Sequence, residues 1–233
     1  MLYSRVALER SLITILPCLA LFLCSCMATT GTTTSLTQTK LQEIKELGIL
    51  TTSKEEFSVR LARNEKSNVG GAMFGLVGAM VEAGTRSYSD GQREKELSGR
   101  LGNYDVTKVL SDRLYIHLES AKTFRAVKNV KTDVSKELKG MGIDSALMVT
   151  VNEWGLRLCP DASRDQVQAI YNVHGKLLLL DDEKVVWEHN QLYLDAECRP
   201  FADFQSTQGL VQDVLSRAAD GVAARITNDI LFP

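Results

Sequence analysis

The five cysteines are the side chains of this sequence best suited to covalent chemistry, and their positions divide them into two groups. Cys18, Cys24 and Cys26 lie close together at the end of the most apolar stretch, whereas Cys159 and Cys198 stand apart in the second half of the chain. A thiol can form a disulfide, bind a metal, act as a nucleophile or carry a lipid. The sequence around each group decides which of these reactions is expected.

The N-terminal sequence is typical of a secretion signal. Arg5 and Arg10 precede an uncharged apolar run at residues 11–23, which matches the basic and apolar regions of a signal peptide. A transmembrane helix needs roughly 20 apolar residues, and this run is shorter and contains Pro17. We therefore expect residues 1–25 to be a removable signal.

Residues 23–26, with the sequence LCSC, resemble the bacterial lipobox, although Cys24 stands where the lipobox usually has another small residue. The resemblance implies that Cys26 receives a covalent lipid, the only cofactor expected, and becomes the first residue of the mature protein. Met27 implies export to the periplasmic face of the outer membrane in a Gram-negative cell. The alternative is an ordinary signal peptide or an uncleaved anchor with incidental cysteines.

Cys159 and Cys198 are candidates for a disulfide. A pair of cysteines in an oxidising periplasm is expected to be bridged where the fold brings the two thiols together. Pro160 and charged residues follow Cys159, so a disulfide explains this cysteine with fewer assumptions than a nucleophile. The alternative is two separate thiols.

The remaining residues do not form a recognised catalytic set. His174 and His189 lie on two arms of an expected hairpin and could approach one metal, but zinc sites need three or four ligands, so we expect no metal site. His117 lies among apolar positions of a helix and is expected to pack there. The sequence lacks GxSxG, HExxH, GxGxxG and a phosphate loop, which favours a protein without catalytic residues.

Glu153, Trp154 and Trp187 are candidates for a protein interface. Buried or half-buried aromatic side chains with polar neighbours dominate the energetics of many interfaces. The alternative, which the pattern favours, is that each tryptophan packs at the edge of the sheet.

Composition excludes one class of partner. The chain has 27 Lys and Arg against 29 Asp and Glu, and such a balance does not suggest a nucleic-acid footprint. The lipid anchor makes the membrane one partner, and other envelope proteins or further copies of the chain are the others expected.

The length indicates a single domain at residues 40–233. The Thr-rich residues 26–39 have little to bury and are expected to be a disordered tether.

A second unusual stretch lies at residues 69–84. It has no charge before Glu82, and Gly71, Gly75, Ala79 and Ala83 recur every four residues. On a helix these small residues form one stripe that allows close packing of another backbone. Three interpretations remain: a buried helix, a membrane-associated or oligomer-forming segment, and a glycine-rich loop.

Periodicity predicts helices and strands in an alternating order. Apolar residues at helical spacing predict helices, and alternation predicts strands. Asp105 is placed to cap a helix. The expected helices are 40–47, 87–101, 105–124, 133–142 and 207–231, and the expected strands are 55–64, 124–130, 145–158, 166–180 and 184–194, the last two forming a hairpin.

This order predicts an α+β domain with helices on one face of a mixed or antiparallel sheet. The segments 124–127 (FRAV), 142–154 (GIDSALMVTVNEW) and 175–190 (GKLLLLDDEKVVWEHN) resemble those of periplasmic domains. These domains are the amino-terminal domain of TolB, the curli-secretion lipoprotein and the lipoprotein activator of penicillin-binding proteins. The expected function is a non-catalytic interaction or assembly factor in the envelope. The alternative is a self-oligomerising secretion or channel component that uses residues 69–84.

Overall fold

The protein is described by a computed structural model over residues 36–60, 88–160 and 165–233. A seven-stranded sheet forms its centre, with the strand order β3-β1-β4-β5-β6; β2 pairs with β4, and β7 pairs with β5. The strands are β1 (Glu46–Ser53), β2 (Ser58–Arg60), β3 (Ala126–Asn129), β4 (Ser145–Leu158), β5 (Gln166–Leu179), β6 (Lys184–Leu194) and β7 (Arg199–Pro200).

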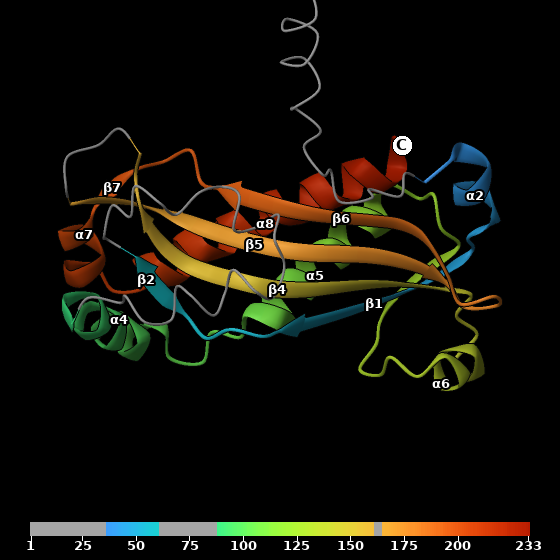
Figure 1. The fold of residues 1–233 in the computed structure, drawn as a ribbon, viewed down its shortest axis with the longest axis horizontal. Coiled ribbons are helices and arrows are strands. Elements are labelled where there is room, and N and C mark those ends of the chain that lie inside the picture. The colour runs from blue at the N-terminus through green and yellow to red at the C-terminus, as the bar shows by residue number, and fades with distance from the viewer. Residues whose placement is uncertain (1–35, 61–87, 161–164) are drawn as a thin grey trace, which may run out of the picture. The chain divides into compact units, whose positions relative to one another are not determined.

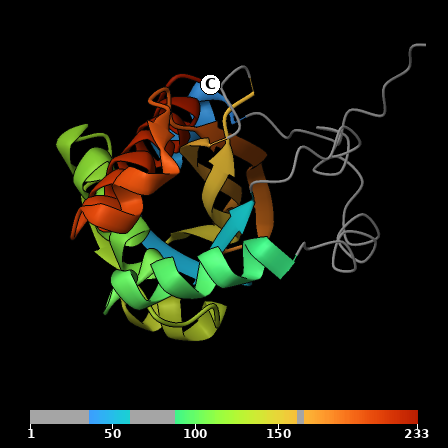
Figure 2. The same cartoon turned by 90° about the vertical axis from the view of Figure 1, so that its left-hand side faces the viewer.

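Helices cover mainly one face of this sheet. In Figures 1 and 2 the two long helices α5 and α8 lie side by side on the same face, and α4 lies across one end. The helices are α2 (Gln38–Glu43), α4 (Tyr88–Leu101), α5 (Val106–Ser120), α6 (Ser135–Gly140), α7 (Phe201–Ser206) and α8 (Leu210–Leu231). The predicted α+β class, with helices packed on one face of a sheet, is confirmed.

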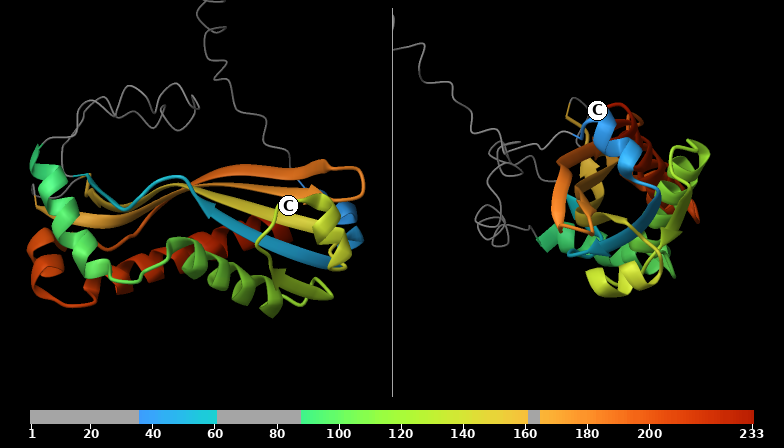
Figure 3. Two further views of the ribbon diagram at one scale, coloured as in Figure 1. Left: turned by 90° about the horizontal axis from the view of Figure 1, so that it is seen from below. Right: turned by 90° about the vertical axis from the view of Figure 1, so that its right-hand side faces the viewer.

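The sheet is mixed. Strand β1 runs parallel to β3 and to β4, and β2 also runs parallel to β4. Strands β4, β5 and β6 form an antiparallel meander, and the strands twist along their length (Figure 3). In the hairpin strands β5 and β6, side chains alternate between the two faces of the sheet, and the apolar ones face the helices.

The main core lies between the sheet and helices α5 and α8. Leu110, Leu114 and Leu118 of α5 recur every four residues and are fully buried, as a helix with one apolar stripe requires. A smaller apolar cluster lies elsewhere in the fold, where Leu138 of α6 packs with Ile143, Ala146 and Leu180. Among the described helices, none combines the length and apolarity needed to cross a bilayer.

The helix predicted at 40–47 is wrong in its second half. The helix α2 ends at Glu43, and residues from Glu46 onward form strand β1. Leu47 and Ile49 alternate with Gly48 and are fully buried, so Gly48 lies within a strand and does not stop a helix. The apolar residues at 41, 44 and 47 have helical spacing, so the sequence predicted a helix here. Strand β1 instead forms by parallel pairing with β3 and β4, which are distant in sequence and leave no local signal.

The strand predicted at 55–64 begins later in the structure, where β2 starts at Ser58 and is described to Arg60; residues 61–64 lie outside the described residues. Phe57 and Val59 are buried as predicted, and Ser58 is buried as well. The short elements α7 and β7 were not predicted. The signal, residues 26–35 of the tether and the stripe at 69–84 lie outside the described residues. The last residues of the predicted tether are ordered, because Leu36 is buried in the core and helix α2 begins at Gln38.

Candidate functional site

A β-bulge in strand β4 sets the position of Trp154. The register against β5 shifts between Val151 and Glu153, so that Val151 pairs with Val173 and Trp154 pairs with Tyr171. One extra residue in a strand reverses the side-chain alternation beyond it. Trp154 therefore shares the helix-facing side with Val151, and Glu153, which simple alternation would place there, does not.

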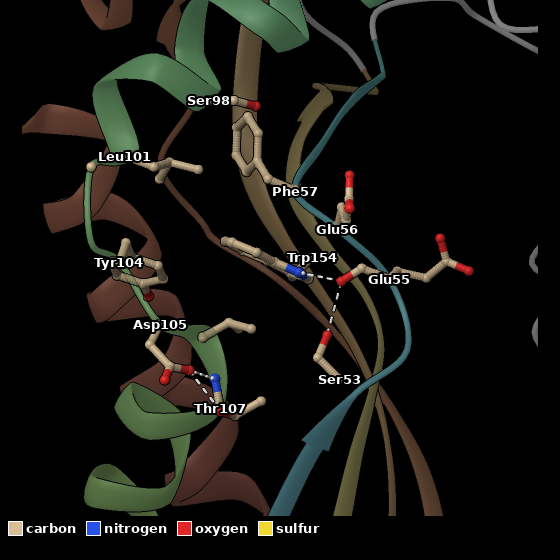
Figure 4. A pocket seen from close by; sticks show the side chains of 12 residues that line it. Ser53, Glu55, Glu56, Phe57, Ser98, Leu101, Tyr104, Asp105, Thr107 and Trp154 are labelled. Atoms are coloured by element: carbon tan, nitrogen blue, oxygen red, sulfur yellow. Dashed lines mark hydrogen bonds between the residues drawn. The ribbon is translucent and has the colours of Figure 1, made fainter.

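Aromatic contacts fix the Trp154 ring. Its centroid lies 5.5 Å from that of Phe57 in an edge arrangement and 5.8 Å from that of Tyr104 in a stacked one. The indole nitrogen Nε1 donates a hydrogen bond to the carbonyl oxygen of Glu55, 2.9 Å away. Ser53 Oγ donates to the same oxygen, also at 2.9 Å. The segment between β1 and β2 is thus attached to the indole (Figure 4).

These side chains form the floor of a pocket with a volume of about 460 Å³. The pocket lies between the segment that joins β1 to β2 and the segment that joins α4 to α5 (Figure 4). Aromatic and aliphatic side chains make its floor, and hydroxyl and carboxylate groups lie around it. The lining residues are Ser53, Glu55, Glu56, Phe57, Ser98, Leu101, Gly102, Tyr104, Asp105, Val106, Thr107 and Trp154.

The charges of the pocket are all negative. Glu55, Glu56 and Asp105 contribute carboxylates, and the described lining includes no basic side chain. The hydroxyl of Thr107 and the backbone N–H groups of Lys108 and Thr107 donate hydrogen bonds that hold the pKa of Asp105 below its usual range. Burial raises the pKa of Tyr104, so its phenol stays neutral at neutral pH. Such a pocket suits an apolar group that carries or adjoins a positive charge.

Glycine allows β2 to reach the edge of this pocket. Gly155 has φ of +142°, and a Cβ atom placed on it would lie 1.9 Å from the carbonyl oxygen of Ser58. A side chain is therefore incompatible with the pairing of β2 and β4 at this point. Glu153, the residue before Trp154, lies 3.1 Å from the guanidinium of Arg60 on β2.

The three candidates for an interface have different positions. Trp154 and Trp187 are only 6% and 4% exposed, so both tryptophans pack in the core. Trp187 lies on the edge strand β6, as expected, whereas Trp154 lies on the central strand β4 and not at the edge of the sheet. The Trp187 ring lies over Gly175, where a Cβ atom would approach it to 2.7 Å. Glu153 is mostly buried beside Arg60. The carboxylates of Glu55 and Glu56, which the sequence did not single out, lie exposed beside Trp154 instead.

The histidines are dispersed. His174 pairs with Asn190, and His189 pairs with Gly175 because of a register shift in the hairpin, so the two histidines point to opposite faces of the sheet. Each histidine contacts one acid: His174 lies 2.8 Å from Glu188, His189 lies 2.9 Å from Asp229, and His117 lies 3.1 Å from Asp220. In the described parts of the chain no three potential ligands cluster as a metal site.

A disulfide joins Cys159 and Cys198, whose sulfur atoms are 2.04 Å apart. It connects the end of β4 with the segment before β7, on the side of the sheet where β5 begins. Cys26 and the stripe of Gly71, Gly75, Ala79 and Ala83 lie outside the described residues.

The fold is a small α+β domain with an aromatic pocket whose charged groups are carboxylates. No protein family matches the chain, and no curated protein matches it significantly. Solved structures with a similar arrangement include a protein from Xanthomonas campestris, with 12% identity over 81% of this chain and 84% of that one, at a TM-score of 0.47. A second is the PelC dodecamer from Paraburkholderia phytofirmans, with 11% identity over 80% and 86% of the two chains and a TM-score of 0.40. A third is lipoprotein GNA1162 from Neisseria meningitidis, with 16% identity over 77% and 98% and a TM-score of 0.26. At these identities and scores no activity or partner is transferred from them to this chain.

Proposed function

We propose that this protein is a lipoprotein anchored to the periplasmic face of the outer membrane, where it acts as a non-catalytic interaction or assembly factor of the cell envelope. The anchor is a lipid on Cys26, followed by a Thr-rich stretch that ends before helix α2 at Gln38. The domain at 40–233 binds other envelope proteins through exposed surfaces. The observation that carries the proposal is the disulfide between Cys159 and Cys198.

Structural disulfides persist in oxidising compartments such as the bacterial periplasm and are rare in the cytosol. The disulfide supports export of the chain, and the lipobox-like sequence at 23–26 supports lipidation of the exported product. A protein with three acyl chains on one cysteine would stay firmly on the membrane, because two or more chains already give stable anchoring.

The pocket beside Trp154 supports the interaction role. Its floor is aromatic, and its charged groups are carboxylates. Such a surface can bind a side chain from a partner, and aromatic floors with charged rims contribute strongly to protein recognition.

Membrane attachment is tested with two matched cysteine variants of the full chain. We expect Cys26→Ala to prevent incorporation of labelled palmitate and to release the protein from the membrane fraction. Cys24→Ala, two residues away, is the control and is expected to keep both properties. Palmitate labelling of the Cys26→Ala variant equal to that of the control would exclude this anchor.

The interaction role is tested by affinity purification from cross-linked cells with mass spectrometry. The full chain is compared with Cys26→Ala, with a deletion of residues 69–84, and with Glu55→Lys/Glu56→Lys. Loss of a defined envelope protein in one variant identifies the surface that binds it. If the wild type and the three variants recover the same proteins at equal yield, then neither the lipid anchor, nor residues 69–84, nor the carboxylates of Glu55 and Glu56 are needed for binding, and the proposed interaction role fails.

A further inference from the structure

The disulfide between Cys159 and Cys198 joins a buried residue to an exposed one. Cys159, directly after β4, is 1% exposed, whereas Cys198 is exposed in the segment between β6 and β7. Thiol–disulfide exchange needs access to only one of the two sulfur atoms, because a mixed disulfide formed there is displaced by the other cysteine. Cys198 is therefore the cysteine that an oxidant or a reductant meets first.

The disulfide is the covalent tie of the segment that leads to helix α7. Strand β7, which follows Cys198, pairs with β5 over two residues, Arg199 and Pro200. Glu197 adds ion pairs with Arg199 and Arg217 at the surface, and such pairs contribute little to stability. Helix α7 begins directly after β7, so its attachment to the sheet depends strongly on the disulfide.

Helix α7 supports helix α4. Phe201 of α7 is buried, and the guanidinium of Arg93 on α4 lies 5.3 Å from the centre of its ring. Gln205 Nε2 of α7 donates a hydrogen bond to Glu96 Oε2 of α4 over 3.0 Å. Figures 1 and 3 show the two helices beside each other at one end of the domain. A displacement of α7 would therefore remove part of the support of α4.

Helix α4 has little packing of its own and forms one wall of the pocket beside Trp154. In residues 91–101 only Leu97 and Leu101 are buried. Elements with few buried apolar contacts open locally at low cost in free energy. Gln212 of α8 donates a hydrogen bond to the carbonyl oxygen of Leu101 over 2.7 Å, and a single bond of this kind contributes modestly. The pocket wall thus belongs to an element that needs the contacts with α7.

We infer that the disulfide controls the pocket by ordering α7 and, through it, α4. With both thiols reduced, the segment before β7 is released, α7 loosens and α4 opens locally. The pocket then loses the wall made by Ser98, Leu101 and Gly102. Formation of the disulfide assembles this wall.

The reaction that assembles the pocket is an exchange with an oxidant that carries a disulfide. The Cys198 thiolate attacks the oxidant's disulfide and forms a mixed disulfide. The Cys159 thiolate then attacks the Cys198 sulfur and displaces the second sulfur of the oxidant. The two cysteines lose two protons and one electron pair, and the oxidant takes them up as a dithiol. The timing of this step rests on the proposed export, because thiols stay reduced in the cytosol and are oxidised in the periplasm, so the pocket forms only after export.

Amide hydrogen exchange of the purified full chain in detergent, followed by mass spectrometry, tests the inference. The oxidised wild type is compared with the same protein in dithiothreitol and with Cys159→Ser/Cys198→Ser. We expect the amides of residues 91–102 to exchange about tenfold faster when the bond is absent, because local opening becomes easier. Residues 106–118 of α5 should change less. Neither lipidation nor a partner enters this measurement, so it can fail independently of the proposed function.

Two variants separate this connection from a general loss of stability. Phe201→Ala/Gln205→Ala removes contacts of α7 with α4 and keeps the disulfide. Its α4 amides should exchange fast already in the oxidised protein, and dithiothreitol should add little. The control is Leu138→Ala, which removes a buried side chain of the smaller apolar cluster at α6, away from α4 (Figure 1). It should keep slow exchange of α4 when oxidised and the full response to reductant.

The pocket itself is followed by the fluorescence of Trp154. The chain has two tryptophans, so Trp187→Phe leaves Trp154 as the single indole. Quenching by acrylamide should increase about twofold on reduction, because the opened wall exposes the ring.

Four results would each overturn the inference. These are equal α4 exchange with and without the bond, an undiminished response to reductant in Phe201→Ala/Gln205→Ala, α4 exchange in oxidised Leu138→Ala as fast as in the reduced wild type, and quenching of Trp154 that reduction leaves unchanged.

Discussion

The indole nitrogen of Trp154 donates a hydrogen bond to the carbonyl oxygen of Glu55 over 2.9 Å. This bond connects the centre of the sheet with the segment that carries the acidic residues of the pocket. The backbone conformation of the segment, and hence the placement of Glu55 and Glu56, therefore depends on a side chain in the core. A substitution of Trp154 should therefore change both the stability of the fold and the shape of the pocket.

Truncating Trp154 should reduce both stability and pocket formation. We expect Trp154→Ala to lower the free energy of unfolding by about 3–5 kcal/mol, because a large aromatic side chain is lost from the core. Trp154→Phe should cost less and should remove mainly the hydrogen bond, worth about 1 kcal/mol. Urea denaturation followed by circular dichroism measures both values.

Trp187→Phe is the matched control for the Trp154→Phe change. Trp187 is equally buried but packs over Gly175 and is not among the residues that line the pocket. Protease cleavage near residue 55 should increase in Trp154→Phe and stay unchanged in Trp187→Phe. Equal cleavage in the two variants would show that the hydrogen bond does not hold the segment.

Asp105 should stabilise the domain in a way that depends on pH. Its Oδ1 atom accepts hydrogen bonds from the backbone N–H groups of Thr107 and Lys108, each at 3.0 Å, and so caps helix α5. Loss of such a cap by Asp105→Ala should cost about 1 kcal/mol at neutral pH.

The sign of the pH dependence follows from the lowered pKa of Asp105. The hydroxyl of Thr107 is the main cause of the lowering, so the folded state binds the proton less tightly than the unfolded state does. The stabilisation is present above the ordinary value of 3.8 and is lost as the pH falls through the lower folded pKa. The difference between wild type and Asp105→Ala should shrink below pH 3.8.

The control for this prediction is Asp112→Ala, which removes only an exposed ion pair with Lys108 inside the same helix. Exposed pairs of this kind contribute roughly 0.3–0.5 kcal/mol. A cost for Asp105→Ala no greater than that of Asp112→Ala, or a cost independent of pH, would contradict the role of Asp105 as a cap.

Gly155 should not tolerate any side chain. An added Cβ atom would overlap the carbonyl oxygen of Ser58 at 1.9 Å, and the backbone lies at a φ that other residues rarely adopt. We expect Gly155→Ala to detach β2 from β4 and to lower the unfolding free energy by about 2–3 kcal/mol or more, by strain and lost pairing.

Gly99→Ala provides the opposite control. Nothing lies within 4 Å of a Cβ atom on Gly99, which is in the last turns of helix α4. This change should raise stability by up to about 1 kcal/mol, because alanine favours the helix. If the two substitutions had similar effects, the close approach of β2 to Gly155 would be disproved.

Local patterns were sufficient for the antiparallel part of the fold. The alternation at 166–180 and 184–194 predicted the hairpin of strands β5 and β6, and helical spacing predicted the helices α5 and α8. In these elements each residue's environment follows from its own neighbours in sequence, because the apolar period matches the period of the element.

The pocket depends on relationships that no local pattern contains. Strand β1 forms by parallel pairing with β3 and β4, which come much later in the sequence. The bulge before Glu153 reverses the alternation, so counting along β4 alone would place Glu153 on the helix-facing side in place of Trp154. The sequence identified Trp154 and Asp105 as notable residues, but it could not bring them together with Phe57 and Tyr104.

The disulfide between Cys159 and Cys198 should contribute strongly to stability. The two cysteines are 39 positions apart, and closing a loop of that length restricts the unfolded chain by about 4 kcal/mol in the loop-entropy estimate. The enclosed segment contains all of β5 and β6, so unfolding of the bridged chain leaves the ends of these strands close together.

We therefore expect dithiothreitol to shift the urea midpoint of the wild type down to that of Cys159→Ala/Cys198→Ala, and to leave this variant unchanged. The single variants should match the double variant, because either change removes the bridge. A midpoint insensitive to reductant would show that the bridge does not restrict the unfolded chain. A further drop of the double variant in reductant would mean that another pair of thiols is bridged, since Cys159 and Cys198 would no longer be present to react.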